Sequence, residues 1–345
     1  MLTVLSVGFP LAPVGPDAVG GSEQVLAALD AALVAAGHRS IVLACEGSVV
    51  AGEHISVRLP PEPFNDNARA TAWRRVRRQL DRHMATCDIV HLHGLDFHAY
   101  LPSPGPPALA TMHLPPDWYD PEALHPARPR TWLHGVSHHQ HRRLAELAES
   151  GRLLPPVQNG VDVERLGAGG SARCDYALML GRICPEKGQH LALQAAHRAD
   201  VPLLIGGITF PYPEHRAYFS EQVAPLLDNR RRWLGAVGFD RKRRLLGGAR
   251  CLLVPSLAPE TSSLVAMEAL AAGTPVIAFD AGALCEIVDD GRTGFLVAGV
   301  DGIVAALARV CSIDRAVCRQ VARERFSIAR MIEGYFGMYR QLAPQ

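Results

Sequence analysis

The sequence predicts an α/β fold made of two doubly wound parallel sheets, one in each half of the chain. Short apolar runs alternate with longer amphipathic segments along the 345 residues, as expected for strands and helices in succession. The apolar runs contain few polar residues, so both faces of each strand should be buried, as in a parallel sheet covered by helices. The alternation pauses near the middle of the chain and then resumes, which predicts two similar halves.

In the first half, a strand at Thr3–Val7 is followed by a loop that contains several glycines and by a helix from about Ser22 to Ala36. Further strands are expected at Ile41–Cys45, His54–Leu59, Asp88–Leu92, Ala108–Met112 and Trp132–Val136. Helices are expected at Ala68–Ala85 and His138–Glu149. Because the pattern is that of a doubly wound fold, these strands should lie parallel in one sheet.

The glycine-rich segment Asn159–Ser171, with the sequence NGVDVERLGAGGS, is the expected linker between the halves. After it, strands are expected at Tyr176–Leu180, Pro202–Ile205, Cys251–Pro255, Pro275–Phe279 and Gly294–Val297. An amphipathic segment at Ser327–Leu342 trails after the second half. We therefore expect domains at residues 1–166 and 167–326, followed by a terminal helix within residues 327–345.

The composition gives no reason to expect a nucleic-acid partner. The formal net charge is only +1, with 48% hydrophobic and 20% charged residues, whereas nucleic-acid-binding domains are usually strongly basic. Arginines are locally dense at Arg74, Arg75, Arg77, Arg78 and Arg82, and again within Arg241–Arg244. The simpler interpretation of each cluster is a solvated helix face, and contact with an acidic membrane surface or an anionic acceptor is the alternative.

Cysteine usage and hydropathy favour a reduced, cytoplasmic protein. The eight cysteines are scattered and form no CxxC pair, so a zinc knuckle or a disulfide framework is not expected. The first residues, MLTVLSVGFPLAP, lack the basic start of a signal peptide and continue into a predicted strand. No apolar stretch reaches the ~20 residues that a membrane-spanning helix needs.

The segment Pro259–Glu268, with the sequence PETSSLVAME, is the most informative part of the chain. It places Glu260 just after a predicted buried strand and Glu268 inside an apolar helix, where an unpaired carboxylate is costly. Ser262 and Ser263 are expected to cap this helix. The two acids should lie on the order of 10 Å apart, too far for a glycosidase pair. They suit the two ends of an extended ligand, and the helix N-terminus between them favours a phosphate. A nucleotide-diphosphate sugar has this form.

A second loop carries two cations. The segment Leu180–Gly188, with the sequence LGRICPEKG, ends a strand at Gly181 and then places Arg182 and Lys187 in one connection. The planar fork of an arginine and the point charge of a lysine together suit a diphosphate. A role for Lys187 as an ordinary surface residue is the simpler alternative.

The first loop reads GPDAVGGSEQ, and its Gly20 and Gly21 would let the backbone approach a ligand at the start of a helix. A tight strand-to-helix turn explains the same glycines without a ligand. The loop does not match GxGxxG, although Glu46 follows the second strand, where a dinucleotide-binding fold holds its ribose acid. Dinucleotide binding is therefore kept only as an alternative.

Three histidines follow strand ends in the first half. His91 and His93 alternate at the end of one predicted strand, and His113 follows another. The carboxyl ends of parallel strands are where ligands bind, so His113 is expected to be functional. Hydrogen bonding at a strand end is the simpler role for His91 and His93. A metal site with Asp96 lacks further ligands in the sequence, so no metal is expected.

These segments together resemble the group 1 retaining glycosyltransferases, the glycogen synthase-like and sucrose synthase-like enzymes with the GT-B fold. The matching pieces are GGSE at Gly20–Glu23, NGVD at Asn159–Asp162, GRICPEKG at Gly181–Gly188, the acids Glu260 and Glu268, and PVIAFDAGALCEIVDDGRTGFLV at Pro275–Val297. The resemblance spans essentially the whole chain. It implies two Rossmann-like domains facing across a cleft, with acceptor binding in the first, nucleotide-sugar binding in the second, and a terminal helix that returns to the first.

The resemblance also implies roles for individual residues. Arg182 and Lys187 would bind the donor diphosphate, Glu260 the sugar hydroxyls and Glu268 the ribose hydroxyls, while His113 would lie beside the transferred sugar. The remaining donor-binding positions would act through their backbone: Gly20, Gly21, Gly181, Ser263, Leu264 and Val265.

The activity implied is transfer of a sugar, with retention of configuration, from a nucleotide-diphosphate sugar, expected to be a UDP-sugar. The acceptor would be a hydroxyl of a small molecule, a saccharide or a lipid, and neither a cofactor nor a metal is expected. The chain departs from the family at Ser262 and Ser263, where a phenylalanine-glycine pair is common. A nucleotide-sugar epimerase or hydrolase and a non-catalytic nucleotide-sugar-binding protein are the alternatives. The sequence does not indicate the oligomeric state.

Overall fold

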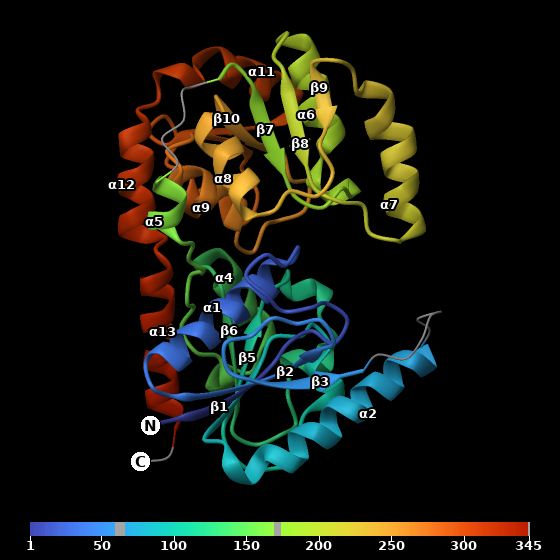
Figure 1. The fold of residues 1–345 in the computed structure, drawn as a ribbon, viewed down its shortest axis with the longest axis vertical. Helices are drawn as coiled ribbons and strands as arrows, with labels where there is room; N and C mark the ends of the chain where they lie inside the picture. Colours follow the sequence, from blue (N-terminus) through green and yellow to red (C-terminus); the bar gives the residue numbers. More distant parts are fainter. Residues whose placement is uncertain (59–65, 169–173, 344–345) are drawn as a thin grey trace. The chain divides into compact units, whose positions relative to one another are not determined.

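The computed structural model describes residues 1–58, 66–168 and 174–343. The chain forms two compact units (Figure 1): the first comprises Met1–Asn159 and Met331–Gln345, and the second comprises Gly160–Arg330. Within the described residues, no helix combines the length and the apolarity needed to cross a membrane.

The first unit is built on a parallel sheet of six strands in the order β3-β2-β1-β4-β5-β6. Its strands are β1 (Thr3–Val7), β2 (Arg39–Cys45), β3 (Glu53–Val57), β4 (Ile89–Leu92), β5 (Ala108–Met112) and β6 (Thr131–Gly135). The central strands β1, β4 and β5 are buried along nearly their whole length, because helices cover both faces of such a sheet. The prediction of a doubly wound parallel sheet is therefore confirmed for this half.

The helices of the first unit follow from amphipathic sequence. They are α1 (Gly21–Ala35), α2 (Asp66–His83), α3 (Pro121–Leu124), α4 (His138–Leu147) and the part of α13 (Ile328–Leu342) from Met331 onward. In α2, Ala72, Val76 and Leu80 recur every four residues and are buried, so one stripe of the helix faces the core. The arginines between them are exposed to solvent.

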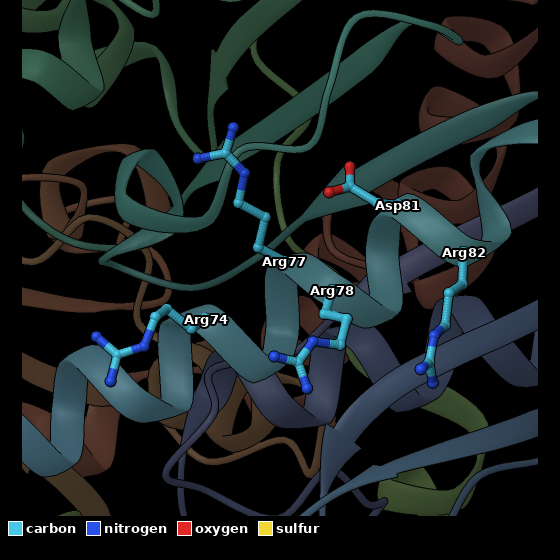
Figure 2. A pocket seen from close by; sticks show the side chains of 5 residues that line it. All are labelled: Arg74, Arg77, Arg78, Asp81 and Arg82. Atoms are coloured by element: carbon cyan, nitrogen blue, oxygen red, sulfur yellow. The ribbon is translucent and has the colours of Figure 1, made fainter.

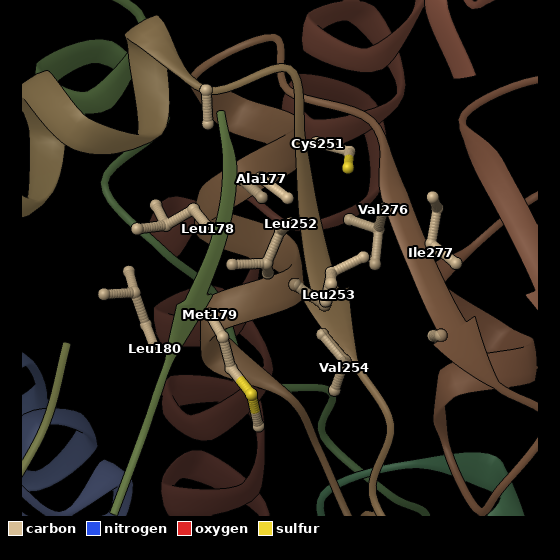
Figure 3. Close-up of a cluster of buried hydrophobic side chains, with 14 of the residues drawn as sticks. Ala177, Leu178, Met179, Leu180, Cys251, Leu252, Leu253, Val254, Val276 and Ile277 are labelled. Carbon is tan, nitrogen blue, oxygen red and sulfur yellow. The ribbon is translucent and has the colours of Figure 1, made fainter. Parts of the chain in front are cut away.

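The second unit repeats the same topology with a parallel sheet in the order β12-β11-β10-β7-β8-β9. Its strands are β7 (Ala177–Leu180), β8 (Leu203–Gly206), β9 (Arg231–Trp233), β10 (Cys251–Val254), β11 (Val276–Phe279) and β12 (Gly294–Val297). Figure 3 shows the apolar side chains of β7, β10 and β11 gathered into a core that includes Leu178, Leu252 and Val276. Burying each leucine of this kind stabilises the fold by about 1.5–3 kcal/mol.

The helices of the second unit pack on the two faces of this sheet. They are α5 (Val163–Gly167), α6 (Gln189–Arg198), α7 (Pro213–Tyr218), α8 (Phe239–Gly248), α9 (Leu264–Ala271), α10 (Leu284–Ile287), α11 (Gly299–Arg309) and α12 (Arg315–Arg325). Short 3-10 turns join several elements, including one at Pro185–Lys187.

Beyond shifts of one or two residues at element ends, the structure departs from the predictions at β9 and at the division between the halves. The edge strand β9 was not predicted, because its sequence Arg231–Trp233 is mostly charged. The first domain was expected to end at residue 166, whereas the division falls after Asn159, because α5 packs against α9 and α12 of the second unit. Leu59, predicted to end a strand, and the last part of the predicted linker, residues 169–171, lie outside the described residues.

Both sheets reverse their winding direction at a defined pair of neighbouring strands. In the first unit the reversal lies between β1 and β4, and in the second it lies between β7 and β10. Loops leaving the carboxyl ends of two such strands diverge to opposite sides, which opens a crevice that binds ligands in doubly wound proteins. The residues that follow β7 and β10 are therefore the first place to look for a site.

Buried histidines connect α13 to the sheet of the first unit. Nδ1 of His91 lies 2.7 Å from the hydroxyl of Tyr339, and Nε2 of His91 lies 2.7 Å from Oγ1 of Thr111. The same Thr111 oxygen lies 2.7 Å from Nε2 of His134. These groups are fully or almost fully buried, so this network orders α13 against β4, β5 and β6.

Burial keeps these histidines neutral. A second pair joins the cluster, since Nδ1 of His93 lies 2.9 Å from Nε2 of His113. Desolvation lowers the pKa of His113 to about 3 and that of His134 to about 4. The pKa values of His91 and His93 are also held well below the usual value, first by burial and then by neighbouring histidines.

These shifts predict that acid destabilises the protein before its carboxylates titrate. In the unfolded chain a histidine binds a proton with a pKa near 6.5. The unfolded state therefore binds more protons than the folded state below about pH 6.5, and the free energy of unfolding falls as the pH falls from there. Urea unfolding at pH 7.5 and pH 5.5 should give a lower value at pH 5.5. The variant His113→Asn should show a smaller drop in unfolding free energy between pH 7.5 and pH 5.5. The reduction should be up to about 1.4 kcal/mol for each pH unit below 6.5.

The exposed His125 provides the matched control, because His125→Asn removes an imidazole that is not buried. Its variant should keep the wild-type difference between the two pH values. An unfolding free energy of the wild type that is unchanged or higher at pH 5.5 would contradict the burial of neutral histidines.

Candidate functional site

The loop after β7 brings an arginine to the carboxyl end of the second sheet. Gly181 has φ of 148°, a conformation that side-chain-bearing residues rarely adopt. A Cβ atom on the neighbouring Gly207 would lie only 1.8 Å from the carbonyl oxygen of Gly181, so both positions require glycine. Arg182 follows, with its guanidinium carbon 5.2 Å from the ring centre of Phe210. The aromatic ring thus helps to hold the arginine in place.

The loops after β7 and β10 meet through an ion pair. Nζ of Lys187 lies 2.6 Å from Oε1 of Glu260, and the hydroxyl of Ser256 donates a hydrogen bond to the same oxygen. The Glu260 side chain is only 10% exposed and that of Lys187 is 30% exposed, so the pair is largely shielded from water. Lys187 is therefore an internal partner of Glu260, and its interpretation as an ordinary surface residue does not fit.

The backbone of Glu260 is fixed by a close approach to the chain after β11. The amide of Ala283 donates to the carbonyl of Glu260 at 2.6 Å. Gly282 has φ of 66°, and a Cβ atom there would lie 2.2 Å from that carbonyl oxygen. Only glycine allows this contact. The segment AGA at residues 281–283 thus positions the acid.

Helix α9 starts directly after this acid, but it is not capped as the sequence suggests. Among the described residues, Ser263 at the N-cap position makes no side-chain capping hydrogen bond, and the buried hydroxyl of Ser262 has no hydrogen-bond partner. The capping prediction for both serines is therefore wrong. Ser263 has φ of −95° and ψ of 91°, an extended backbone conformation that suits an N-cap, so it is the side chain that fails to cap. The amides of Leu264 and Val265 lie in the first turn of α9, where backbone N–H groups lack intrahelical acceptors.

Glu268 is buried on α9 and has a cationic partner. Its side chain is 6% exposed and pairs through Oε1 with Nζ of Lys242, which is itself 15% exposed and belongs to α8. Phe239 packs near this lysine, with its ring centre 5.7 Å from Nζ. Oε2 of Glu268 is buried and has no hydrogen-bond partner among the described residues. A buried carboxylate oxygen of this kind is suited to accept a hydrogen bond from a ligand.

In the first unit, Gly20 is the N-cap of α1 and Gly21 is its first residue. Gly20 has an ordinary φ of −85°, so its backbone conformation does not require glycine. A Cβ atom there would lie 1.8 Å from Oε2 of Glu23, whose buried side chain folds back over the helix start. The carboxylate of Glu23 thus lies where the glycines are expected to approach a ligand. The sequence analysis did not anticipate this contact.

His113 lies just beyond β5 and is partly buried. Its ring stacks on that of His93, with centres 5.2 Å apart and an angle of 21°. With its lowered pKa the imidazole is neutral near pH 7, so it can act as a hydrogen-bond partner rather than as a cation.

The structure brings together, within the second unit, Arg182, Lys187, Glu260 and the start of α9, all on connections that leave the carboxyl ends of β7 and β10. Gly20, Gly21 and His113 belong to the first unit. Sequence analysis missed the partners of the two acids, Ser256 and Lys242. Ser256 could have been predicted as a site residue, because it is a polar residue directly after a strand. Lys242 lies within the basic run Arg241–Arg244, whose simpler interpretation was a solvated helix face.

The arginines of α2 form a separate feature of the first unit. Figure 2 shows Arg74, Arg77, Arg78 and Arg82 projecting from this helix together with Asp81. They line a shallow hollow of about 530 Å³ that opens to solvent. All five residues are exposed, so the cluster is a solvated helix face with a strongly positive surface.

Comparison with known proteins identifies the family on both halves of the chain. Residues 175–312 match the profile described as glycosyl transferases group 1, and residues 19–165 match the profile described as glycosyltransferase family 4. Alpha-maltose-1-phosphate synthase of Mycobacterium tuberculosis is 29% identical over 222 residues, covering 55% of this chain and 57% of its own length. D-inositol 3-phosphate glycosyltransferase of Nocardia farcinica is 32% identical over 228 residues, covering 57% and 50%. The chain spans about half the length of these curated relatives.

Solved structures resemble the whole chain. Sucrose-phosphate synthase from Thermosynechococcus elongatus superposes with a TM-score of 0.79 at 19% identity, covering 99% of each chain. Alr3699/HepE of Anabaena, solved with UDP and glucose, gives 0.77 at 16% identity and covers 99% of this chain and 100% of its own. AviGT4, a glycosyltransferase involved in avilamycin A biosynthesis, gives 0.72 at 23% identity, covering 99% and 98%. At these identities the likeness concerns the fold. The two profile matches assign the chain to the group 1 glycosyl transferases, and the structural likeness shows that it has the GT-B fold.

Proposed function

We propose that the protein is a retaining glycosyltransferase that moves a sugar from a nucleotide-diphosphate sugar, preferably a UDP-sugar, to an acceptor hydroxyl. The observation that carries this proposal is the pairing of Lys187 with Glu260, at 2.6 Å, where the loops after β7 and β10 meet. The pair combines a fixed cation with an acid at the strand ends where doubly wound folds bind ligands. The crystal structures of Alr3699/HepE with UDP and with UDP-glucose favour UDP as the nucleotide.

The leaving diphosphate would be stabilised by positive charge held in place before the reaction. When the bond at the anomeric carbon breaks, negative charge develops on the diphosphate. Arg182, steadied by Phe210, and Lys187 would face that charge, and the amides of Ser263, Leu264 and Val265 would donate hydrogen bonds to the phosphates. Two fixed cations in this role support transfer without a divalent metal. Gly181 would allow the loop to approach the phosphates closely.

The two acids would bind the hydroxyl groups at the two ends of the donor. Both known partners of Glu260, Lys187 and Ser256, bind its Oε1, which leaves Oε2 for hydroxyls of the transferred sugar. Lys242 binds Oε1 of Glu268, and the buried Oε2 of Glu268 is oriented for a ribose hydroxyl. In each case a lysine fixes the position of the carboxylate, whose second oxygen can accept hydrogen bonds from hydroxyls.

The acceptor would bind mainly to the first unit and the donor to the second. We propose that the acceptor hydroxyl attacks on the face from which the diphosphate departs, and that a phosphate oxygen takes its proton, so that the anomeric configuration is retained. Neutral His113 would accept or donate a hydrogen bond beside the transferred sugar. Gly20 and Gly21 would approach the diphosphate from the first unit, provided that the Glu23 side chain moves aside.

Removing either cation should abolish most of the transfer. Arg182→Ala and Lys187→Ala should each lower kcat by roughly 10²–10³, because each removes a donor that acts on the developing charge. The effect is measured as the rate of UDP release when UDP-glucose is incubated with a panel of hydroxyl acceptors. Arg198→Ala is the matched control, since Arg198 is exposed on α6 and pairs with Asp301, away from these loops. Near-wild-type turnover in both site variants would refute the diphosphate assignment.

The same assay separates the alternatives. A nucleotide-sugar epimerase or hydrolase would convert the donor without any acceptor, and nuclear magnetic resonance would detect the new isomer or the free sugar. A non-catalytic binding protein would bind UDP in calorimetry and transfer sugar to no acceptor.

If Glu268 binds the ribose hydroxyls, the variant Glu268→Gln should lose affinity for UDP but not for an analogue that lacks those hydroxyls. The variant should bind UDP about 10-fold or more weakly, because a hydrogen bond to a charged group is worth about 1.5–3 kcal/mol. The wild type should discriminate against a dideoxyribose analogue of UDP, and the variant should bind UDP and the analogue almost equally. Calorimetry of both ligands with both proteins measures this. If the variant still prefers UDP by the wild-type factor, Glu268 does not contact the ribose.

The arginine face of α2 supports a further, peripheral contact with an anionic membrane. Each basic residue near such a surface contributes about 1 kcal/mol. Co-sedimentation with vesicles of phosphatidylserine and phosphatidylcholine should therefore be lost when Arg74, Arg77, Arg78 and Arg82 are all changed to Gln. A control with the same charge change uses the exposed arginines Arg198, Arg232, Arg241 and Arg244 of the second unit. Equal binding by both variants would argue against a role for α2.

A further inference from the structure

Three side chains with metal-ligating chemistry converge between the loop after β7 and helix α7, and none of them is a site residue named above. The sulfur of Cys184, a carboxylate oxygen of Glu186 and a ring nitrogen of His215 all lie within 4.8 Å of one another. Cys184 and Glu186 belong to the connection after β7, and His215 lies on α7, which follows β8. The cluster therefore joins two separate connections of the second sheet.

Within the cluster, the Cys184 thiol donates to the Arg182 carbonyl at 3.8 Å and is hydrogen-bonded to the Glu186 carboxylate, whereas His215 is incompletely paired. Nδ1 of His215 is buried and has no hydrogen-bond partner among the described residues, which is unusual for a polar atom. Two aromatic rings orient its imidazole: Tyr212 meets it edge-on with centres 5.1 Å apart, and Phe210 stacks near it at 6.4 Å. Cys184 is only 1% exposed. The sulfur and the imidazole are thus held at a protected position.

The backbone around the cluster is well supported. The amide of Ile183 donates to the carbonyl of Ile208 at 2.9 Å, which ties the loop after β7 to the segment after β8. On α7, the hydroxyl of Tyr218 lies 2.9 Å from Nδ1 of His190 on α6. The two elements that contribute ligands are therefore each anchored to the same sheet and helix layer, so a small movement of side chains suffices to close the cluster.

The donor set selects the class of ion. A thiolate and an imidazole favour zinc over magnesium or calcium, which prefer all-oxygen sites. Ligand atoms around tetrahedral zinc lie roughly 3.4–3.6 Å apart, as follows from bonds of about 2.0–2.3 Å. Since the three ligand atoms lie within 4.8 Å of one another, they need to approach by no more than about 1 Å, which rotation of the partly exposed Glu186 and His215 side chains can provide.

We propose that Cys184, Glu186 and His215 bind one Zn²⁺ ion, with a water molecule as the fourth ligand. Binding forms the zinc–sulfur bond and releases the thiol proton to solvent, so that the thiolate and the carboxylate together balance the charge of the ion. The ion would fasten α7 to the connection that carries Arg182 and Lys187. It would stabilise this loop rather than take part in sugar transfer.

Metal binding by the full-length protein tests the proposal without reference to activity. Protein freed of metal with a chelator should bind one Zn²⁺ per chain in competition with a chromophoric chelator. Added Co²⁺ should produce thiolate-to-metal charge-transfer absorption in the near ultraviolet. Cys184→Ser should lose this absorption, and both Cys184→Ser and His215→Ala should bind Zn²⁺ at least about 10-fold more weakly.

Controls distinguish a built site from surface binding by other cysteines and histidines. Cys311→Ser and His125→Ala remove exposed residues of the same types and should keep the wild-type affinity. Zn²⁺ should raise the Tm of the wild type and of these controls, and it should not raise that of the two site variants. Circular dichroism without metal verifies that each variant is folded. Equal Zn²⁺ affinity in wild type and folded Cys184→Ser, or a Co²⁺ complex without the thiolate band, would overturn the proposal.

Discussion

The second unit depends on the close approach of three chain segments around Glu260. Gly282 lets the backbone after β11 contact the carbonyl of Glu260, and this contact holds the acid beside β10. Lys187, which arrives from the loop after β7, then meets the carboxylate at 2.6 Å. Removal of either charge would leave the other poorly solvated and unpaired, which is strongly unfavourable. The acid and its cation therefore define each other's position.

The two units share one topology but carry different polar groups at their strand ends. In the second unit the strand ends carry charged groups, namely Arg182, Lys187 and Glu260. In the first unit the corresponding strand ends carry His93 and His113, which burial keeps neutral. Charge at the strand ends suits a diphosphate, and neutral imidazoles suit hydroxyl groups. The division between donor and acceptor binding that we propose follows this contrast.

Much of the fold could be predicted because its signals are local. The strand bounds Thr3–Val7, Ala108–Met112 and Gly294–Val297 agree with the structure, since each is a short apolar run that is largely buried. The edge strand β9 escaped because it is short and charged, and its pairing with β8 is a long-range contact. The side-chain cap expected from Ser263 is also missing, because the local sequence pattern does not determine where the serine hydroxyl points.

The sequence by itself determined the α/β class, the repeated halves and the residue types of the candidate site, because periodicity and motif spacing are properties of neighbouring residues. Only the tertiary structure decided which groups meet. The pairs Lys187–Glu260 and Lys242–Glu268 join residues 73 and 26 positions apart, and Cys184 and His215, whose ligand atoms lie within 4.8 Å, belong to two different strand connections. Such contacts depend on the order of strands in the sheet, which brings distant loops to one edge and which local sequence does not specify.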